Sequence, residues 1–169
     1  MEKESWLKYF PYSKPRDQQV KVINKVLSDF EKDKKYAIIE CGTGVGKSAI
    51  GLTIARYLNN KFKDSEESGC YFLTTQKILQ EQYEKDFINI GMKSLYSSVN
   101  YSCKRKKGSS CKDIQDLIRQ GAEKPQQEKC SFDCIYKKKK EEFCNSDLSI
   151  TNFSYFLTEK NYNGKTPRK

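Results

Sequence analysis

The amino-acid sequence predicts an α/β protein built around a parallel sheet, and three observations predict this class. Helix-like and strand-like patterns alternate through residues 1–90, and a glycine-rich stretch joins a strand-like run to a helix-like one. A further strand-like run returns at residues 148–151. Because parallel strands are joined by crossover connections, such alternation is typical of a sheet with helices on its faces.

Two elements are predicted before the glycine-rich stretch. Residues 17–33 carry apolar side chains at helical spacing, and Pro15 and Asp17 suit the start of a helix. Residues 36–40, Tyr-Ala-Ile-Ile-Glu, form a compact apolar run. This run predicts a buried strand that leads directly into the glycine-rich stretch.

The elements predicted after that stretch repeat the alternation. A polar loop spans residues 59–69, and a loop is also expected at the polar tail, residues 161–169. Residues 152–157 suit the start of a helix or a turn. The remaining predictions are helices at 47–58 and 76–87 and strands at 70–74 and 148–151.

Residues 91–142 differ from their surroundings and predict an insertion into the α/β domain. They are polar, basic and rich in cysteine, with one short amphipathic turn at Ile114, Leu117 and Ile118. We therefore expect three parts: 1–90 as the first part of the α/β domain, 91–142 as the insertion, and 143–169 as the return to that domain.

The charge balance points to a polyanionic partner such as nucleic acid, or to a surface of solvated lysines. The chain has 32 Lys and Arg against 22 Asp and Glu, a formal net charge of +10. No run of about 18 apolar residues is present, and residues 1–14 lack the apolar core of a signal peptide. We expect an intracellular, cytoplasmic protein without a membrane partner.

The chain has seven cysteines and no histidine. In a reducing compartment, clustered cysteines bind metal more often than they form disulfides. Any metal site must therefore use thiolates, with carboxylates as the other available ligand.

Residues 40–48, Glu-Cys-Gly-Thr-Gly-Val-Gly-Lys-Ser, predict a phosphate-binding loop between a strand and a helix. Its glycines let the backbone direct N–H groups inward, and the helix N-terminus adds partial positive charge. Lys47 can reach the β- and γ-phosphates of ATP, and the Ser48 hydroxyl can ligate Mg²⁺. The predicted ATP-binding residues of the loop are Cys41, Gly42, Thr43, Gly44, Val45, Gly46, Lys47 and Ser48, with Lys47 and Ser48 as the catalytic pair.

Four features in order resemble the N-terminal part of the iron–sulfur superfamily 2 DNA helicases of the XPD/DinG group. They are residues 15–19, the loop at 40–48, residues 72–82 and the cysteine-rich segment. The resemblance implies a RecA-like P-loop domain, in which Arg16 and Gln19 contact the adenine. It also implies that Thr74, Thr75 and Gln76 contact DNA phosphates. An ordinary helix start at 15–19 and a capped strand-to-helix junction at Thr75 are the plainer alternatives.

In this family four cysteines hold a [4Fe–4S] cluster, and the resemblance assigns that role to Cys103, Cys111, Cys130 and Cys134. Cys144 is left out because it lies at the return to the core. Four thiolates suit tetrahedral Zn²⁺ equally well, and their spacing does not separate the two metals.

The resemblance implies an ATP-dependent helicase that moves 5′ to 3′ on single-stranded or forked DNA. An acidic Walker B box is expected only after residue 169, so we expect a fragment of a longer motor that is inactive alone. Two alternatives remain open. One is a module that binds nucleotide and nucleic acid without catalysis, and the other is a different P-loop ATPase with a zinc-binding insertion.

Overall fold

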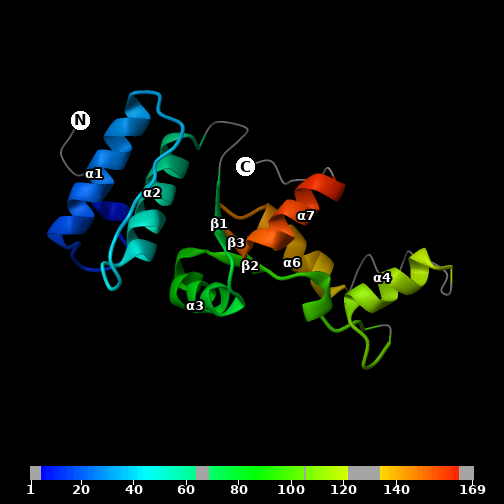
Figure 1. Cartoon of the computed structure of the whole chain (residues 1–169). Helices are drawn as coiled ribbons and strands as arrows, with labels where there is room; N and C mark the ends of the chain where they lie inside the picture. Colours follow the sequence, from blue (N-terminus) through cyan, green and yellow to red (C-terminus); the bar gives the residue numbers. More distant parts are fainter. Residues whose placement is uncertain (1–4, 64–68, 105, 122–133, 164–169) are drawn as a thin grey trace. The chain divides into compact units, whose positions relative to one another are not determined.

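The computed structural model describes residues 5–63, 69–104, 106–121 and 134–163 (Figure 1). The chain divides into two compact units, Met1–Ser68 and Gly69–Lys169. Each unit has a core of its own and is described by itself. In the part of the chain that the structure describes, no helix is both long and apolar enough to cross a membrane.

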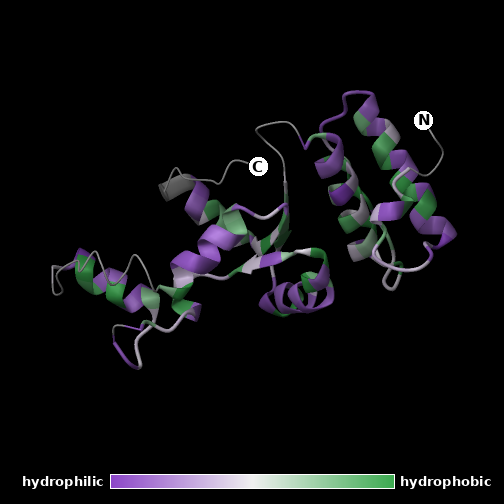
Figure 2. Ribbon diagram, turned by 180° about the vertical axis from the view of Figure 1, so that it is seen from behind, coloured by the Kyte–Doolittle hydropathy of each residue, from purple (hydrophilic) through white to green (hydrophobic). Residues whose placement is uncertain are grey.

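The first unit is a pair of helices packed on an N-terminal turn. The helices are α1 (Asp17–Glu31) and α2 (Lys47–Lys61), and the turn is the short 3-10 helix η1 (Leu7–Tyr9). Hydrophobic and hydrophilic segments alternate along α1 (Figure 2), as expected for a helix with one buried face. That face packs against α2 and against Trp6, which is fully buried and donates its Nε1–H to Asn24 Oδ1 at 2.7 Å.

The prediction of a buried strand at residues 36–40 is wrong. The segment has no strand assignment, Ile38 is 99% exposed and Tyr36 is 86% exposed. A strand needs a neighbour for its N–H and C=O groups, and the described residues of this unit, 5–63, contain no strand at all. The run is apolar, but its burial depends on a partner strand that the sequence pattern does not supply.

The second unit is built on a three-stranded parallel sheet in the order β1-β3-β2. The strands are β1 (Cys70–Thr74), β3 (Leu148–Asn152) and β2 (Lys93–Leu95). Ile150 lies at the centre, in register with Phe72 on one side and Ser94 on the other, and it is fully buried. The expected parallel sheet is therefore present.

Helices cover both faces of this sheet. Successive side chains of a strand point to opposite faces. On one face Phe72 meets Tyr83 of α3 (Lys77–Phe87), with ring centroids 6.0 Å apart. On the other face Tyr71 meets Phe143 of α6 (Ile135–Cys144) and Phe156 of α7 (Phe153–Asn163), with centroids 5.5 and 5.1 Å apart.

The cysteine-rich segment contains more regular structure than its polarity predicts. The helix α4 (Cys111–Arg119) forms where the short amphipathic turn was expected. Two 3-10 turns, η2 (Ile88–Ile90) and η3 (Ser98–Asn100), flank β2. The strand β2 lies inside residues 91–142 and was not predicted, and α7 continues to Asn163, into the expected tail loop.

Candidate functional site

The glycine-rich loop forms a tight turn at the N-terminus of α2. Gly44 and Gly46 have φ angles of +78° and +83°, in the left-handed region that side chains other than glycine rarely adopt. Gly46 is the N-cap of α2, and its carbonyl accepts hydrogen bonds from the N–H groups of Ala49 and Ile50 at 3.0 and 3.3 Å. The start of a 15-residue helix thus faces the loop, which favours an anion there.

Lys47 lies across the loop. Its Nζ donates to the carbonyl oxygens of Cys41 and Gly42, at 3.1 and 2.8 Å, and the side chain is exposed. A polyphosphate that enters the loop can replace these neutral acceptors by charged oxygens, which form stronger hydrogen bonds. Ser48 follows in the first turn of α2 and is partly exposed, so its hydroxyl remains accessible.

Arg16 and Gln19, at the start of α1, contact the carbonyl groups of the same loop. Arg16 Nη1 donates to Gly44 O at 2.6 Å. Gln19 Nε2 donates to Val45 O at 3.0 Å and to Gly46 O at 3.4 Å, and Gln19 is only 4% exposed. The structure therefore brings these two predicted residues together with the phosphate loop.

The carboxyl ends of β1 and β3 form a second polar region. Thr74 is paired in register with Asn152, and the Thr74 hydroxyl donates to Gln76 O at 3.1 Å. Asn152 Nδ2 donates to Thr75 O at 3.1 Å, while the side chains of Thr75 and Gln76 are exposed. Sequence reasoning missed Asn152, whose role depends on a parallel pairing across 77 residues.

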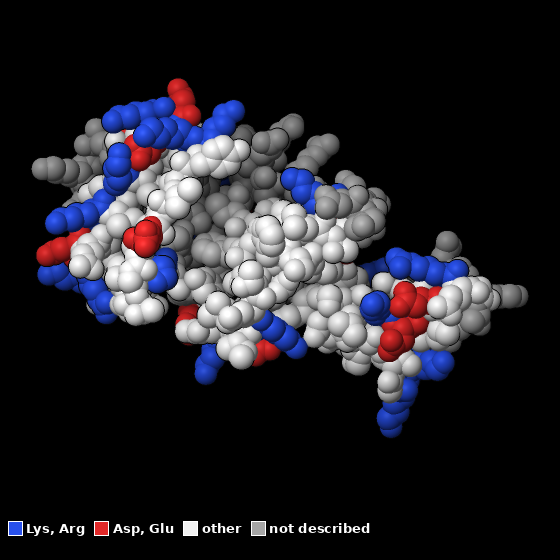
Figure 3. All heavy atoms as spheres, viewed as in Figure 1, with Lys and Arg blue, Asp and Glu red and all other residues white. Residues whose placement is uncertain are grey.

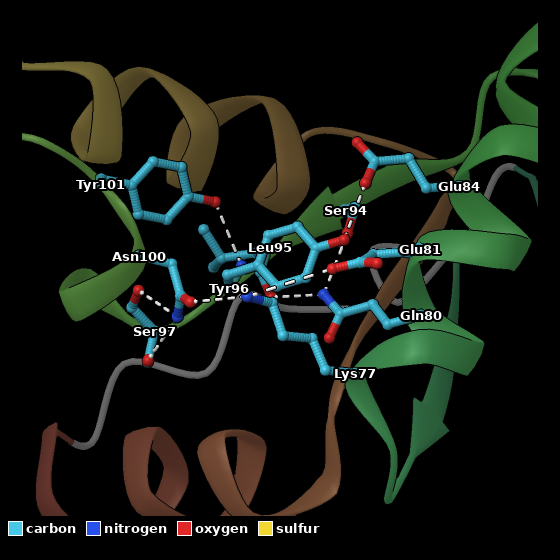
Figure 4. A network of polar contacts seen from close by, with 10 residues as sticks. All are labelled: Lys77, Gln80, Glu81, Glu84, Ser94, Leu95, Tyr96, Ser97, Asn100 and Tyr101. Carbon is cyan, nitrogen blue, oxygen red and sulfur yellow. Dashed lines mark hydrogen bonds and ion pairs between the residues drawn. The ribbon is translucent and has the colours of Figure 1, made fainter.

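A polar network holds the residue that follows this turn (Figure 4). Lys77 Nζ donates to Asn100 Oδ1 at 3.1 Å and lies 5.6 Å from the centroid of the Tyr96 ring. The Tyr96 hydroxyl donates to Glu84 Oε2 at 3.0 Å. Burial, followed by the nearby Glu84 carboxylate, raises the pKa of Tyr96 to about 12 although a contact with Ser94 opposes the shift.

Beneath Lys77, a buried glutamine ties α3 to the sheet. Gln80 is 1% exposed, and its Nε2 donates to Ser94 Oγ at 2.9 Å and to Leu95 O at 3.0 Å. The Thr151 hydroxyl donates to the same Leu95 carbonyl at 2.6 Å. Gln80 was not predicted, and only its polarity on the apolar side of a helix could have marked it.

Two of the four predicted metal ligands lie side by side. The Sγ atoms of Cys111 and Cys134 are 4.0 Å apart in a partly buried setting. Cys103 follows Ser102, which forms an isolated antiparallel bridge with Ser110, and the Cys103 N–H donates to Ser109 O at 2.8 Å. Cys130 lies outside the described residues. Within those residues, no group of three or more metal-binding side chains is present.

Aromatic side chains pack in the same cluster as this cysteine pair. The rings of Tyr101 and Tyr136 meet at a tilt of 53° with centroids 5.5 Å apart, and Tyr136 shares a hydrogen bond with Tyr155 of α7. Burial, followed by this hydrogen bond, raises the pKa of Tyr155 far above its ordinary value. Tyr136 and Tyr155 are therefore neutral, and their hydrogen bond joins α6 to α7. Cys134 is the N-cap of α6.

The exposed charge of the described residues is predominantly basic on the face shown in Figure 3. Lys and Arg side chains gather around α1 and the connection that follows it, where Lys32, Lys34 and Lys35 are all exposed. On α6, Lys137, Lys138 and Lys139 are also exposed. The basic excess is therefore present in both units.

Comparison with known proteins gives one family. Residues 12–161 match the family model described as type III restriction enzyme, res subunit. This range contains both the phosphate loop and all three strands of the sheet. Searches of curated proteins and of solved structures return no match.

Proposed function

Because the chain belongs to the type III restriction enzyme res subunit family, a helicase-like group of superfamily 2, we propose that it forms the ATP-binding front part of a DNA helicase. The observation that carries the proposal is the phosphate loop, a left-handed glycine turn that opens α2 and carries Lys47. A helicase-like family implies the use of ATP and Mg²⁺. The loop offers backbone N–H groups and Lys47 for the phosphates, and the Ser48 hydroxyl for Mg²⁺.

Each group of the loop has a distinct role in this proposal. Backbone N–H groups at the start of α2 bind the phosphate oxygens, and Lys47 neutralises charge on the β- and γ-phosphates. Ser48 Oγ would be a ligand of Mg²⁺, which would offset the remaining phosphate charge. These interactions recognise a triphosphate without reference to its base.

The proposed nucleic-acid contact is the turn after β1. Thr75 and Gln76 are exposed there, and Thr74 and Asn152 hold the turn in place through hydrogen bonds to its backbone. Contacts of this kind, to phosphates, carry no sequence information. Together with the exposed lysines they support binding of single-stranded or forked DNA, and the resemblance to iron–sulfur helicases supports movement in the 5′ to 3′ direction.

Nucleotide binding tests the proposal directly. We expect the chain to bind ATP in the presence of Mg²⁺, and Lys47→Ala to weaken binding about tenfold or more, since a charge-assisted hydrogen bond contributes roughly 1.5–3 kcal/mol. Lys61→Ala, at the other end of the same helix, is the matched control and should bind as the unaltered chain does. Equal affinity for Lys47→Ala and the control would exclude the loop as the site.

We also propose that Cys103, Cys111, Cys130 and Cys134 hold a metal centre, with a [4Fe–4S] cluster as the assignment that the helicase resemblance implies. A specific observation favours a second candidate, a single Zn²⁺. Four sulfurs at 2.3 Å from one ion are about 3.8 Å apart, close to the 4.0 Å between Cys111 and Cys134. In a four-iron cluster each thiolate ligates a different iron, which places the sulfurs further apart.

Metal analysis with a visible spectrum of anaerobically prepared chain distinguishes these centres. About four irons with a broad absorption band would support the cluster, whereas one zinc without colour would support the ion. Cys111→Ser and Cys134→Ser should each lower the metal content, whereas Cys70→Ser in β1 should not. A chain that binds neither metal would contradict both assignments.

A further inference from the structure

The helix α4 places an amide side chain beside one sulfur of the cysteine pair. Gln115 Nε2 donates to Cys111 Sγ at 3.6 Å, an ordinary length for a hydrogen bond to sulfur, which is larger than oxygen. The two residues are four positions apart on α4, and this spacing brings side chains to the same face of a helix. Cys111 Sγ therefore has a thiol neighbour in Cys134 and an amide donor in Gln115.

The position of Gln115 depends on how α4 is anchored. A capping box closes the first turn of the helix, and the Cys111 N–H donates to Tyr101 O at 2.7 Å. Ile114 is 2% exposed, so the helix cannot rotate about its axis without exposing this side chain. Gln115 is itself partly buried. The packing of α4 therefore places the amide of Gln115 at the sulfur.

Apolar and aromatic side chains pack around Cys111. The residue is 8% exposed and belongs to a cluster with Leu95, Tyr136 and Phe143. A hydrogen bond is electrostatically stronger where the protein shields it from water. A thiolate sulfur accepts hydrogen bonds and has no proton to donate. The Nε2–H group of Gln115 therefore suits a thiolate, which is the form of cysteine that binds a metal.

We propose that Gln115 is a positioning residue of the metal centre, which donates a hydrogen bond to the sulfur of Cys111 while that sulfur binds the metal. The proposal rests on the metal centre proposed above. It holds for Zn²⁺ and for an iron–sulfur cluster, because both are bound through thiolate sulfur. The amide N–H stabilises the thiolate charge and holds the sulfur in place.

Metal affinity gives the first test. We expect Gln115→Leu to bind Zn²⁺ about tenfold more weakly than the unaltered chain, in competition with a chromophoric chelator, because the hydrogen-bond partner of a metal ligand is removed. Leucine is a good helix former, so α4 should persist. Gln120→Leu, at an exposed position at the end of the same helix, is the matched control and should keep full affinity. Equal affinity of the two variants would overturn the proposal.

The absorption spectrum of bound Co²⁺ separates a hydrogen bond to sulfur from a role in folding alone. Co²⁺ binds to the same kind of thiolate site as Zn²⁺ and shows charge-transfer bands between sulfur and metal. A hydrogen bond lowers the energy of the sulfur electrons, so its loss in Gln115→Leu should move these bands to longer wavelength. In Gln120→Leu the bands should stay in place. Unmoved bands in Gln115→Leu would contradict the proposal, even if metal affinity fell.

An iron–sulfur cluster, if the chain carries one, gives a further reading. A hydrogen bond to a ligating sulfur stabilises the reduced, more negative cluster, so Gln115→Leu should lower the reduction potential whereas Gln120→Leu should not. An unchanged potential would overturn the proposal. A chain that carries no iron and binds neither Zn²⁺ nor Co²⁺ would refute the metal centre itself, and the role of Gln115 with it. A chain that binds metal equally well with and without Gln115 would refute that role alone.

Discussion

The two units of the chain present their polar groups in different ways. In the phosphate-loop unit the groups that we propose for phosphate binding belong mainly to the backbone, and the buried side chain of Gln19 donates a hydrogen bond to that backbone on the side facing α1. In the sheet unit the exposed groups are side chains, including Thr75 and Gln76, placed by the pairing of distant strands. The first arrangement depends on a short sequence, whereas the second depends on long-range packing.

This difference explains what each unit tolerates. A loop that works through its backbone is sensitive to glycine replacements and to the residues that orient its carbonyls. A sheet edge that works through side chains is sensitive to anything that shifts the register of the strands. Substitutions in the phosphate loop should therefore lower ligand affinity, whereas substitutions in the sheet should lower stability.

The largest effect on stability is expected at the centre of the sheet. Ile150→Ala should destabilise the sheet unit by about 2–5 kcal/mol, because it leaves a cavity at a fully buried site in β3. Chemical denaturation followed by circular dichroism measures this loss. Ile78→Ala, on the exposed face of α3 with Ile78 76% exposed, should change stability little. Equal losses for the two variants would contradict the sheet as the core of this unit.

Gly46→Ala should change the free energy of unfolding less than Ile150→Ala does, but it should weaken ATP binding strongly. The new Cβ meets Gln19 Nε2, and an L-residue in the left-handed region costs roughly 1–2 kcal/mol. We expect ATP to bind about tenfold more weakly, as measured by titration calorimetry. Gly108→Ala has a similar φ of +85° and open space around it, so it carries the strain without the clash. If it weakens ATP binding equally, the loop geometry is not the cause.

A moderate effect is expected at the start of α4. The Ser110 hydroxyl accepts the N–H of Asp113 at 3.2 Å, and Asp113 Oδ2 accepts the N–H of Ser110 at 2.8 Å. Ser110→Ala should cost about 1 kcal/mol and loosen the helix that carries Cys111. Hydrogen exchange across residues 111–119 measures the loosening. The same substitution should leave ATP affinity unchanged, because it lies in the other unit.

The smallest effect is a change in alkaline stability. Burial raises the pKa of Tyr96 to about 12 in the folded chain, above the ordinary value of about 10. The stability that depends on neutral Tyr96 is therefore complete below pH 10 and is lost as the pH rises toward 12. Tyr96→Phe should show a shallower fall in unfolding midpoint over this range. A slope identical to that of the unaltered chain would contradict the partly buried setting of Tyr96.

The sequence predicts the elements whose signal is local. The helix expected at 17–33 is found at Asp17–Glu31, and the strand expected at 70–74 is found with the same bounds, because periodicity and β-propensity act within each segment. The phosphate loop is predictable for the same reason, since its residues are contiguous. How Arg16 and Gln19 bind that loop could not be predicted, because it depends on packing between α1 and α2.

The missed features share a different cause. Strand β2 has only three residues, of which Lys93 is exposed, so it shows almost no pattern and is defined by pairing with β3. Residues 36–40 carry a clear apolar pattern, but the described part of their own unit offers no strand to pair with. In both cases a segment acquires its structure from a partner distant in sequence, which a pattern within the segment does not record.

The exposure of residues 36–40 has a consequence for how the chain behaves at high concentration. An exposed apolar segment without a strand partner, such as this one with Ile38, can pair with the same segment of another molecule and start self-association. Lys34, Lys35 and Glu40 are charged and exposed at its two ends, and in a parallel pair the lysines lie beside their counterparts and repel them. Added salt screens that repulsion, so concentrated preparations should remain monodisperse best at low ionic strength.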